Sequence, residues 1–171
     1  MSSDRKITDT PSIERLRELF AYEPDTGVIT RLVAAGRSRS MSTVGAICDT
    51  GYLVVKVDGK KLKAHRLAWA LYHGSWPKNH IDHINGVKTD NRLSNLRDVT
   101  VAQNLQNQRR PQVSNKSCEF LGVSLDKRKN LWVAQIQVNR KGIYIGRFKT
   151  AEEAHAAYVQ KKRELHPTCT F

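Results

Sequence analysis

The sequence predicts an α+β protein of two small domains, and three features of the chain lead to this prediction. Strand-like runs joined by tight turns alternate with short stretches of helical spacing before residue 109. After residue 118, an alternating run is followed by one longer helix. Between these parts lies a polar stretch with a proline, which is typical of a linker. The expected division is therefore 1–109, a linker over 110–117, and 118–171.

The first domain is expected to begin with a helix followed by a short strand. Apolar residues recur at helical spacing over 12–22, and Ser12 is suited to cap the helix. A turn then leads to a strand over 28–30. The stretch 31–43 is rich in arginine and serine and is predicted to be a basic loop.

A hairpin and a second helix are expected next. The Asp-Gly pair at 58–59 is a strong signal for a two-residue turn between strands 51–57 and 61–64. The following residues, 65–72, place apolar side chains on one helical face. Gly74 can end this helix in the left-handed conformation.

The stretch 81–104 predicts the order strand, turn, loop, strand and helix. Asn-Gly at 85–86 favours a tight turn after the first strand. The second strand is expected over 96–99. A Thr-x-x-Gln capping box at 100–103 predicts a helix over 101–109.

The second domain is predicted to be a three-stranded antiparallel sheet packed on one helix. The residues 132–138 alternate between an apolar face and a polar face, which indicates a half-buried strand. A second strand is expected over 143–148, and the sheet is expected to start near 122–124. A capping box at 150–153 predicts the helix that follows.

Composition points to a polyanionic partner. The chain has 171 residues and a formal net charge of +13, and basic side chains that neutralise phosphates release condensed counterions. Ribosomal and membrane-surface proteins are also basic, so charge alone leaves the partner open. No apolar run approaches the roughly 18–20 residues that span a bilayer, and no signal peptide is recognised. The three cysteines, Cys48, Cys118 and Cys169, are widely spaced, which argues against a disulfide framework or a cysteine zinc knuckle.

Chemistry-bearing residues are concentrated between residues 81 and 104. Asp82 lies directly beside His83, and Asn95 and Asn104 follow at wider spacing. Carboxylate and amide oxygens suit Mg²⁺ or Mn²⁺, and histidine can take a proton from water near neutral pH. The stretch therefore indicates metal-assisted phosphodiester hydrolysis. Adjacent strand residues point to opposite faces, so Asp82 and His83 can face one phosphate only if the strand ends or bends there.

Several of these residues also have ordinary structural interpretations. Asp82, Asn85 and Asn91 suit turns, Asn95 suits a local cap, and Asn104 suits a solvated helix face. His80 competes with His83 for the role of general base. For His65, which lies at the start of a predicted helix, a structural role is favoured over a catalytic one.

The ordered series of motifs resembles the HNH homing endonucleases, especially those of phages and their introns, over residues 12–108. The matching segments are His65–Trp69, Trp76-Pro77, Ile81–Gly86, Asp90–Arg92, Asn95–Arg97 and Thr100 with Asn104. This resemblance implies the ββα-metal fold, in which a hairpin and a helix surround one divalent cation, Mg²⁺ or Mn²⁺.

The resemblance also assigns roles to four residues. His83 would be the general base that activates the attacking water. Asp82 and Asn104 would be the metal ligands. Asn95 would hold His83 in orientation through a backbone or side-chain hydrogen bond.

The C-terminal residues 118–166 resemble the DNA-binding domain of plant ethylene-response factors. The matching segments are Leu121–Ser124, Trp132–Ile136, Tyr144–Phe148 and Thr150–Tyr158. In that family the sheet lies in the DNA major groove and the helix packs behind it. The candidate contacts here are Arg128, Gln135, Gln137, Arg140, Tyr144 and Arg147. At several positions where the plant family has DNA-contacting arginines, this chain has Leu121, Ser124, Gln137 and Gly142 instead. The plant target specificity therefore does not transfer.

Together these features predict a metal-dependent DNA endonuclease of the homing type with double-stranded DNA as its partner. Neither a membrane nor a protein partner is expected. A monomer or weak dimer is expected, in the cytoplasm of a bacterial host if the gene is phage-encoded. The alternative is a non-catalytic DNA-binding regulator whose nuclease fold has decayed.

Overall fold

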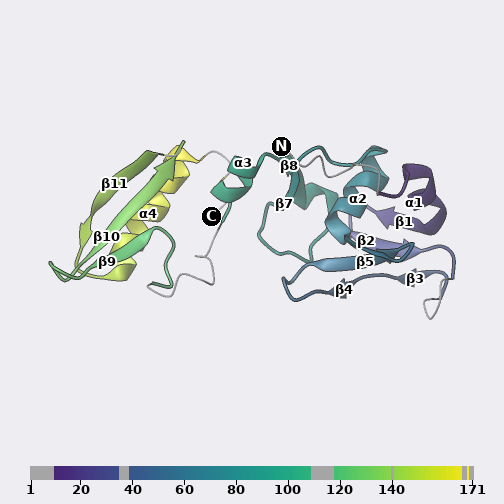
Figure 1. Cartoon of the computed structure of the whole chain (residues 1–171), viewed down its shortest axis with the longest axis horizontal. Coiled ribbons are helices and arrows are strands. Elements are labelled where there is room, and N and C mark those ends of the chain that lie inside the picture. The colour runs from purple at the N-terminus through teal and green to yellow at the C-terminus, as the bar shows by residue number, and fades with distance from the viewer. Residues whose placement is uncertain (1–9, 35–38, 109–117, 140, 167–168, 170–171) are drawn as a thin grey trace, which may run out of the picture. The chain divides into compact units, whose positions relative to one another are not determined.

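The computed structural model describes residues 10–34, 39–108, 118–139, 141–166 and 169. The chain divides into two compact units, Met1–Val99 and Thr100–Phe171 (Figure 1). The architecture is mixed α/β, with small sheets whose recorded strand pairs are antiparallel. The expected linker at 110–117 lies outside the described residues. In the described part, no helix is both long and apolar enough to cross a bilayer.

The described residues of the first unit form three small sheets, with strand orders β1-β2-β3, β4-β5-β6 and β7-β8. Its elements are α1 (Ile13–Leu19), β1 (Phe20–Glu23), β2 (Val28–Arg31), β3 (Ser42–Thr43), β4 (Ala46–Ile47), β5 (Leu53–Val57), β6 (Lys60–Lys63), α2 (Ala64–His73), β7 (His80–His83), the 3-10 helix η2 (Leu93–Asn95) and β8 (Leu96–Val99).

The N-terminal helix begins as predicted but ends earlier. The Ser12 side chain accepts a hydrogen bond from the Arg15 backbone N–H, so the predicted cap is confirmed. The prediction of helix as far as residue 22 is wrong, because the backbone becomes extended at Phe20 and β1 pairs with β2. Phe20 is 2% exposed, so its apolar character reflects burial in the common core rather than continuation of the helix.

The predicted hairpin turn and helix end are both present. Asp58 and Gly59 have φ values of 44° and 85°, as a two-residue turn with two left-handed residues requires. Gly74 ends α2 with φ 67°. The core beneath includes Leu16 and Leu67, which have no exposed surface. The α2 helix therefore joins α1 and the sheets in one apolar core.

In the part of the second unit that the structure describes, one three-stranded sheet has the order β11-β10-β9. Its elements are α3 (Val101–Gln106), β9 (Val123–Asp126), β10 (Leu131–Val138), β11 (Lys141–Phe148) and α4 (Ala151–Leu165). Both predicted capping boxes are confirmed, at Thr100 and at Thr150. The helix α3 ends at Gln106, short of the predicted residue 109.

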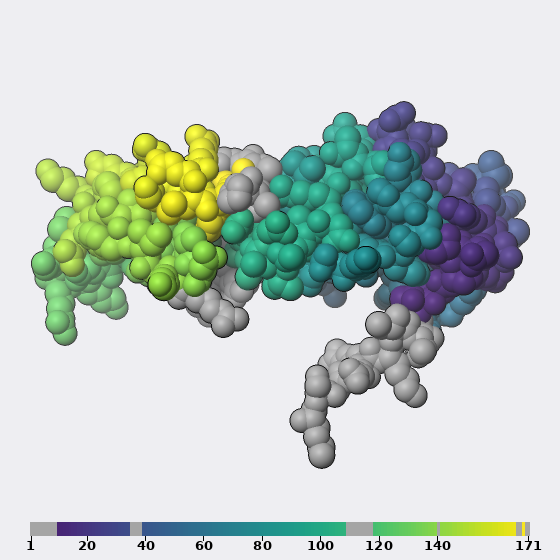
Figure 2. Space-filling model, turned by 90° about the horizontal axis from the view of Figure 1, so that it is seen from above, coloured from purple at the N-terminus to yellow at the C-terminus, as the bar shows by residue number. Residues whose placement is uncertain are grey.

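The α4 helix packs on one face of this sheet (Figure 1). Ala134 and Ile136 of β10 are buried against Ala154 and Tyr158 of α4. Gly122 allows the closest approach, because a Cβ there would lie 2.1 Å from the Tyr158 ring. In the space-filling view of Figure 2, α4 is the yellow segment next to the green strand residues. The opposite face of the sheet keeps its polar side chains exposed.

Candidate active site

The β7–β8 hairpin carries the predicted acid–histidine pair. Asp82 lies opposite Arg97 and His83 lies opposite Leu96 in the antiparallel register. The Asp82 Oδ2 atom accepts hydrogen bonds from Arg97 Nε at 3.0 Å and Nη2 at 2.8 Å. The Asp82 side chain is only 11% exposed. This predicted metal ligand is therefore a nearly buried carboxylate that already faces a positive charge.

His83 is the last residue of β7 and is 4% exposed. Its Nε2 lies 3.2 Å from Asn91 Oδ1. Because an amide oxygen only accepts hydrogen bonds, this contact makes Nε2 the donor and leaves the Nδ1 lone pair as the basic atom. Burial lowers the pKa of His83, although the Asn91 hydrogen bond and the Asp82 charge oppose that effect. The ring is therefore kept neutral and in one tautomer, as a general base requires.

Strand β7 ends at His83, and the chain turns there. Gly86 N–H donates to the His83 carbonyl at 2.9 Å, which turns the chain directly after the histidine. Asp82 nevertheless bonds to Arg97, while His83 bonds to Asn91. The two neighbours thus have different partners, as strand alternation predicts. The Asp82 charge still raises the pKa of His83, in opposition to burial, which lowers it.

Asn95 closes the loop between β7 and β8. Its Oδ1 accepts from Asn85 N–H at 2.9 Å, and its Nδ2 donates to the Asp90 carbonyl at 2.8 Å. Its own carbonyl accepts from Ile84 N–H at 2.9 Å. Asn95 therefore shapes the loop that carries Asn91. The His83 ring forms its recorded hydrogen bond with Asn91, a residue of the same motif, and the orienting role predicted for Asn95 stays a prediction.

Asp90 fixes the same loop from its outer side. Its carboxylate accepts from Arg92 Nη2 at 2.6 Å and from Asn85 Nδ2 at 2.7 Å. The Arg92 hydrogen bond is the largest cause that lowers the pKa of Asp90. The carboxylate is therefore ionised at neutral pH and holds both ends of the turn.

The β1–β2 hairpin supports Asn91 from the far side of the loop. The Tyr22 hydroxyl donates to the Asn91 carbonyl at 2.8 Å, and Leu93 N–H donates to the Pro24 carbonyl at 2.9 Å. Gly27, with φ 75°, packs so closely that a Cβ would lie 2.5 Å from the Asn91 carbonyl carbon. A hairpin whose Tyr22 lies 69 residues before Asn91 in the sequence therefore sets the position of the histidine's partner.

Two aromatic rings enclose His83. The His65 ring lies 5.0 Å from it at an interplanar angle of 90°, and the Tyr52 ring lies 5.9 Å away. His65 is 4% exposed, and its Nδ1 has no hydrogen-bond partner in the described part of the chain. Burial lowers the pKa of His65 to about 3, so this ring is neutral. His80, the competing base, lies exposed at the start of β7.

The other predicted site residues belong to the second unit. Asn104 is half-buried on α3, and its role as a ligand beside Asp82 stays a prediction. Gln135, Gln137 and Tyr144 are exposed on the sheet. Arg147 lies 5.7 Å above the Tyr144 ring and 3.7 Å from Asp126, Arg128 lies exposed in the β9–β10 turn, and Arg140 lies outside the described residues.

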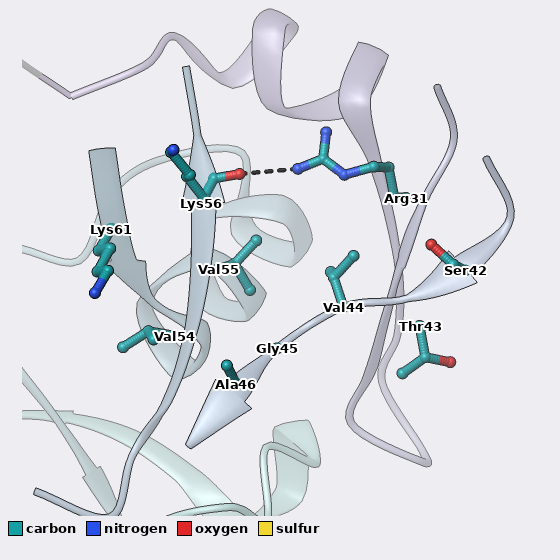
Figure 3. Close-up of a pocket in the computed structure, with 10 residues that line it drawn as sticks. All are labelled: Arg31, Ser42, Thr43, Val44, Gly45, Ala46, Val54, Val55, Lys56 and Lys61. Atoms are coloured by element: carbon teal, nitrogen blue, oxygen red, sulfur yellow. Dashed lines mark hydrogen bonds between the residues drawn. The ribbon is translucent and has the colours of Figure 1, made fainter. Parts of the chain in front are cut away.

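A pocket of about 310 Å³ lies elsewhere in the first unit, between the β2–β3 and β4–β6 strands (Figure 3). The Arg31 guanidinium reaches across it and donates to the Lys56 carbonyl at 2.8 Å. The remaining wall is largely apolar, from Val44, Val54 and Val55. None of the residues around His83 lines this pocket, so it is separate from the candidate active site.

Comparison with known proteins gives a family match for the segment that carries the β7–β8 hairpin. Residues 62–106, which include the whole β7–β8 hairpin, match the family model described as HNH endonuclease. This segment is therefore an HNH endonuclease domain, and the predicted enzyme class is confirmed.

One solved structure is similar to the chain. Its subject is DNA binding and cleavage by the HNH homing endonuclease I-HmuI. The match has 27% sequence identity and a TM-score of 0.42, and it covers 57% of this chain and 56% of that one. The chain thus spans little more than half the length of that relative. No curated protein matches the chain.

Proposed function

We propose that this protein is a metal-dependent DNA endonuclease of the homing type, which hydrolyses a phosphodiester bond in a specific duplex target. One observation carries the proposal: a buried, neutral His83, fixed at Nε2 by Asn91, lies beside the Asp82 carboxylate inside the HNH segment. This arrangement leaves Nδ1 to accept a proton. One such site per chain favours a nick by a monomer, whereas a double-strand break needs a dimer or two successive cuts.

The chemistry assigned to His83 is hydrolysis by an activated water. Nδ1 accepts one proton from a water molecule as the water oxygen attacks phosphorus. The bond between phosphorus and the 3′ oxygen then breaks, and the leaving oxygen takes a proton from solvent. Nε2–H keeps its hydrogen bond to Asn91 Oδ1 before and after this proton transfer, and Asn95 keeps the loop closed behind it.

The donor groups fit one hard divalent cation. In the described part of the chain, no group of three or more His, Cys, Asp and Glu residues could hold a metal. We assign Asp82 and Asn104 as the ligands, which leaves the remaining positions to water and DNA oxygens, as Mg²⁺ prefers. The Asp82 carboxylate forms an ion pair with Arg97, and a carboxylate oxygen of this kind is a preferred ligand for Mg²⁺. A bound Mg²⁺ or Mn²⁺ supplies Lewis-acid stabilisation of the phosphate and the leaving oxygen.

Duplex DNA is the proposed substrate because of surface charge and the second unit. The formal net charge of +13 favours a polyanionic partner. The exposed Gln135 and Gln137 of β10 present amides suited to base edges. We assign the second unit to anchoring in the major groove.

Plasmid and genomic DNA incubated with the purified protein and Mg²⁺ test this proposal. Cleaved ends that map to one sequence are expected, and EDTA should abolish cleavage while Mn²⁺ restores it. Cleavage that persists unchanged in EDTA would remove the metal from the proposal. Specific binding without any cleavage would instead support the DNA-binding regulator.

A further inference from the structure

Two lysine ammonium groups converge on one aromatic ring beside His83. Lys63 Nζ lies 4.4 Å and Lys88 Nζ lies 4.9 Å from the centre of the Tyr52 ring, within the roughly 6 Å reach of a cation–π interaction. The same ring lies 5.1 Å from the His65 ring and 5.9 Å from the His83 ring. Neither lysine has a part in the hydrolysis described above.

This cluster joins three segments that are distant in the sequence. Tyr52 lies just before β5, Lys63 ends β6 and caps α2, and Lys88 lies in the β7–β8 loop. Lys88 Nζ also donates to the Thr50 carbonyl at 2.8 Å. An ammonium group has three donors, so Lys88 keeps N–H groups for a further acceptor. The ring and the carbonyl therefore hold the charge in place without neutralising it.

The charges lie close to the catalytic ring and are not paired within the described residues. Neither lysine forms a salt bridge with a described residue. The Lys88 charge lowers the pKa of His83, and the Lys63 charge lowers that of His65. Two uncompensated cations beside a buried base favour an anion as the missing partner.

We propose that Lys63 and Lys88, held by Tyr52, bind one backbone phosphate of the DNA strand that His83 cuts. The inference rests on the proposed endonuclease function and adds the element that places the strand. We call this phosphate-binding site of Lys63, Lys88 and Tyr52 the seat. Lysine acts on phosphate as a point charge, so the seat does not distinguish one base sequence from another. It fixes the scissile bond next to His83 by holding a neighbouring phosphate.

The first test compares three charge-removing variants on a duplex that contains the mapped cleavage site. Lys63→Gln and Lys88→Gln are each expected to lower kcat/KM about tenfold, as loss of a charged hydrogen bond does. Lys61→Gln is the matched control, because Lys61 lies exposed on the same strand as Lys63, and less than a twofold loss is expected. Equal losses of kcat/KM in all three variants, with unchanged melting temperatures, would mean that these lysines contribute only general electrostatic attraction. That result would overturn the proposed phosphate site.

The second test identifies the phosphate. Duplexes are prepared that carry one neutral methylphosphonate at each position around the cut. At one position near the cut, the wild type should lose about tenfold in rate, while Lys88→Gln loses less than twofold, because its partner is already missing. Lys61→Gln should keep the full tenfold loss.

Each result of the methylphosphonate series has a definite meaning. If no single position couples to Lys88 or Lys63 while the wild type cleaves normally, the seat is wrong and the endonuclease proposal stands. If the wild type cleaves no DNA with Mg²⁺ or Mn²⁺, the endonuclease proposal fails and the seat fails with it.

Discussion

The polar side chains around His83 in the first unit and those on the sheet face of the second unit differ in how deeply they are buried. In the first unit, His83, Asn91 and Asn95 are no more than 6% exposed, and each has a hydrogen-bond partner. In the second unit, Gln135 and Gln137 project from the sheet into solvent. A buried polar network with satisfied partners has one arrangement, whereas exposed amides adapt to what they meet. The first arrangement suits bond cleavage and the second suits binding.

The contrast also appears in how each unit is supported. The first unit draws its site from β1–β2, α2, β7 and the following loop, and it does so through the contacts of Tyr22 with Asn91 and of His65 with His83. The second unit rests on one helix beneath one sheet, with Ala134 and Ala154 fully buried between them. Substitutions in the first unit should therefore change catalysis, and substitutions on the sheet face should change affinity alone.

Replacing His83 should have the largest effect. His83→Ala removes the base and is expected to lower the cleavage rate about a thousandfold, with DNA affinity nearly unchanged. His80→Ala is the control, since His80 is exposed at the other end of β7. Single-turnover cleavage and filter binding measure the two quantities. If His80→Ala removed activity while His83→Ala kept it, the base has been assigned to the wrong histidine.

Displacing Asn91 should come next. Gly27→Ala places a methyl group 2.5 Å from the backbone of Asn91 and Arg92, which must shift the loop. A shift of about 1 Å at a catalytic contact costs about a hundredfold in kcat. Gly59→Ala is the matched control, because φ there is 85° and nothing lies within 4 Å of its Cβ. Both variants should lose about 1 kcal/mol from left-handed strain, and a similar kcat in both would show that the β1–β2 hairpin does not position the site.

The buried His65 should make the first unit sensitive to acid. Its pKa is about 3 in the folded chain and ordinarily 6.5, so below pH 6.5 the unfolded chain binds the proton first. The free energy of unfolding is therefore not reduced by His65 above pH 6.5, and it decreases as the pH falls from 6.5 towards 3. At pH 5 the expected loss is about 2 kcal/mol relative to pH 7.5. Urea unfolding of His65→Phe should lack this part of the pH dependence, whereas His80→Phe should keep it, and identical slopes in wild type and His65→Phe would contradict the burial argument.

Local signals in the sequence predicted the elements but not the support of the site. The turn at 58–59 and the capping boxes at Thr100 and Thr150 depend on residues within three positions of each other, so the pattern suffices. The contacts of Tyr22 with Asn91 and of His65 with His83 join distant segments, and nothing in their spacing reveals them. The helix end at Leu19 was missed for a similar reason, because β1 forms through pairing with β2.

The Asp82–Arg97 contact of the candidate site follows from the sequence once the two strands are paired. Once strands 81–83 and 96–99 are paired around a closed loop, Asp82 must lie opposite Arg97. A strand register follows from the hydrophobic pattern and the turn, so the ion pair could have been predicted. The role of Asn91 could not, because its side chain reaches His83 only after Asn95 and Asp90 have shaped the loop.

The smallest expected effect concerns the sheet face and tests the other side of the comparison. Gln137 lies opposite Gly142, where a Cβ would meet nothing within 4 Å, so the space beside this amide is open to a base edge. Gln135 lies opposite the exposed Tyr144. Each change to alanine should weaken binding to the mapped target by about 1 kcal/mol, the lower end for a base contact. The cleavage rate of bound DNA should not change.

Gln160→Ala is the matched control for this prediction, because Gln160 is exposed on α4 behind the sheet. Fluorescence anisotropy with target and random duplexes separates two kinds of contact. A loss confined to the target duplex indicates base recognition by the sheet. An equal loss on random DNA would mean that these amides contact the backbone, and the source of sequence specificity would then have to be sought in the first unit.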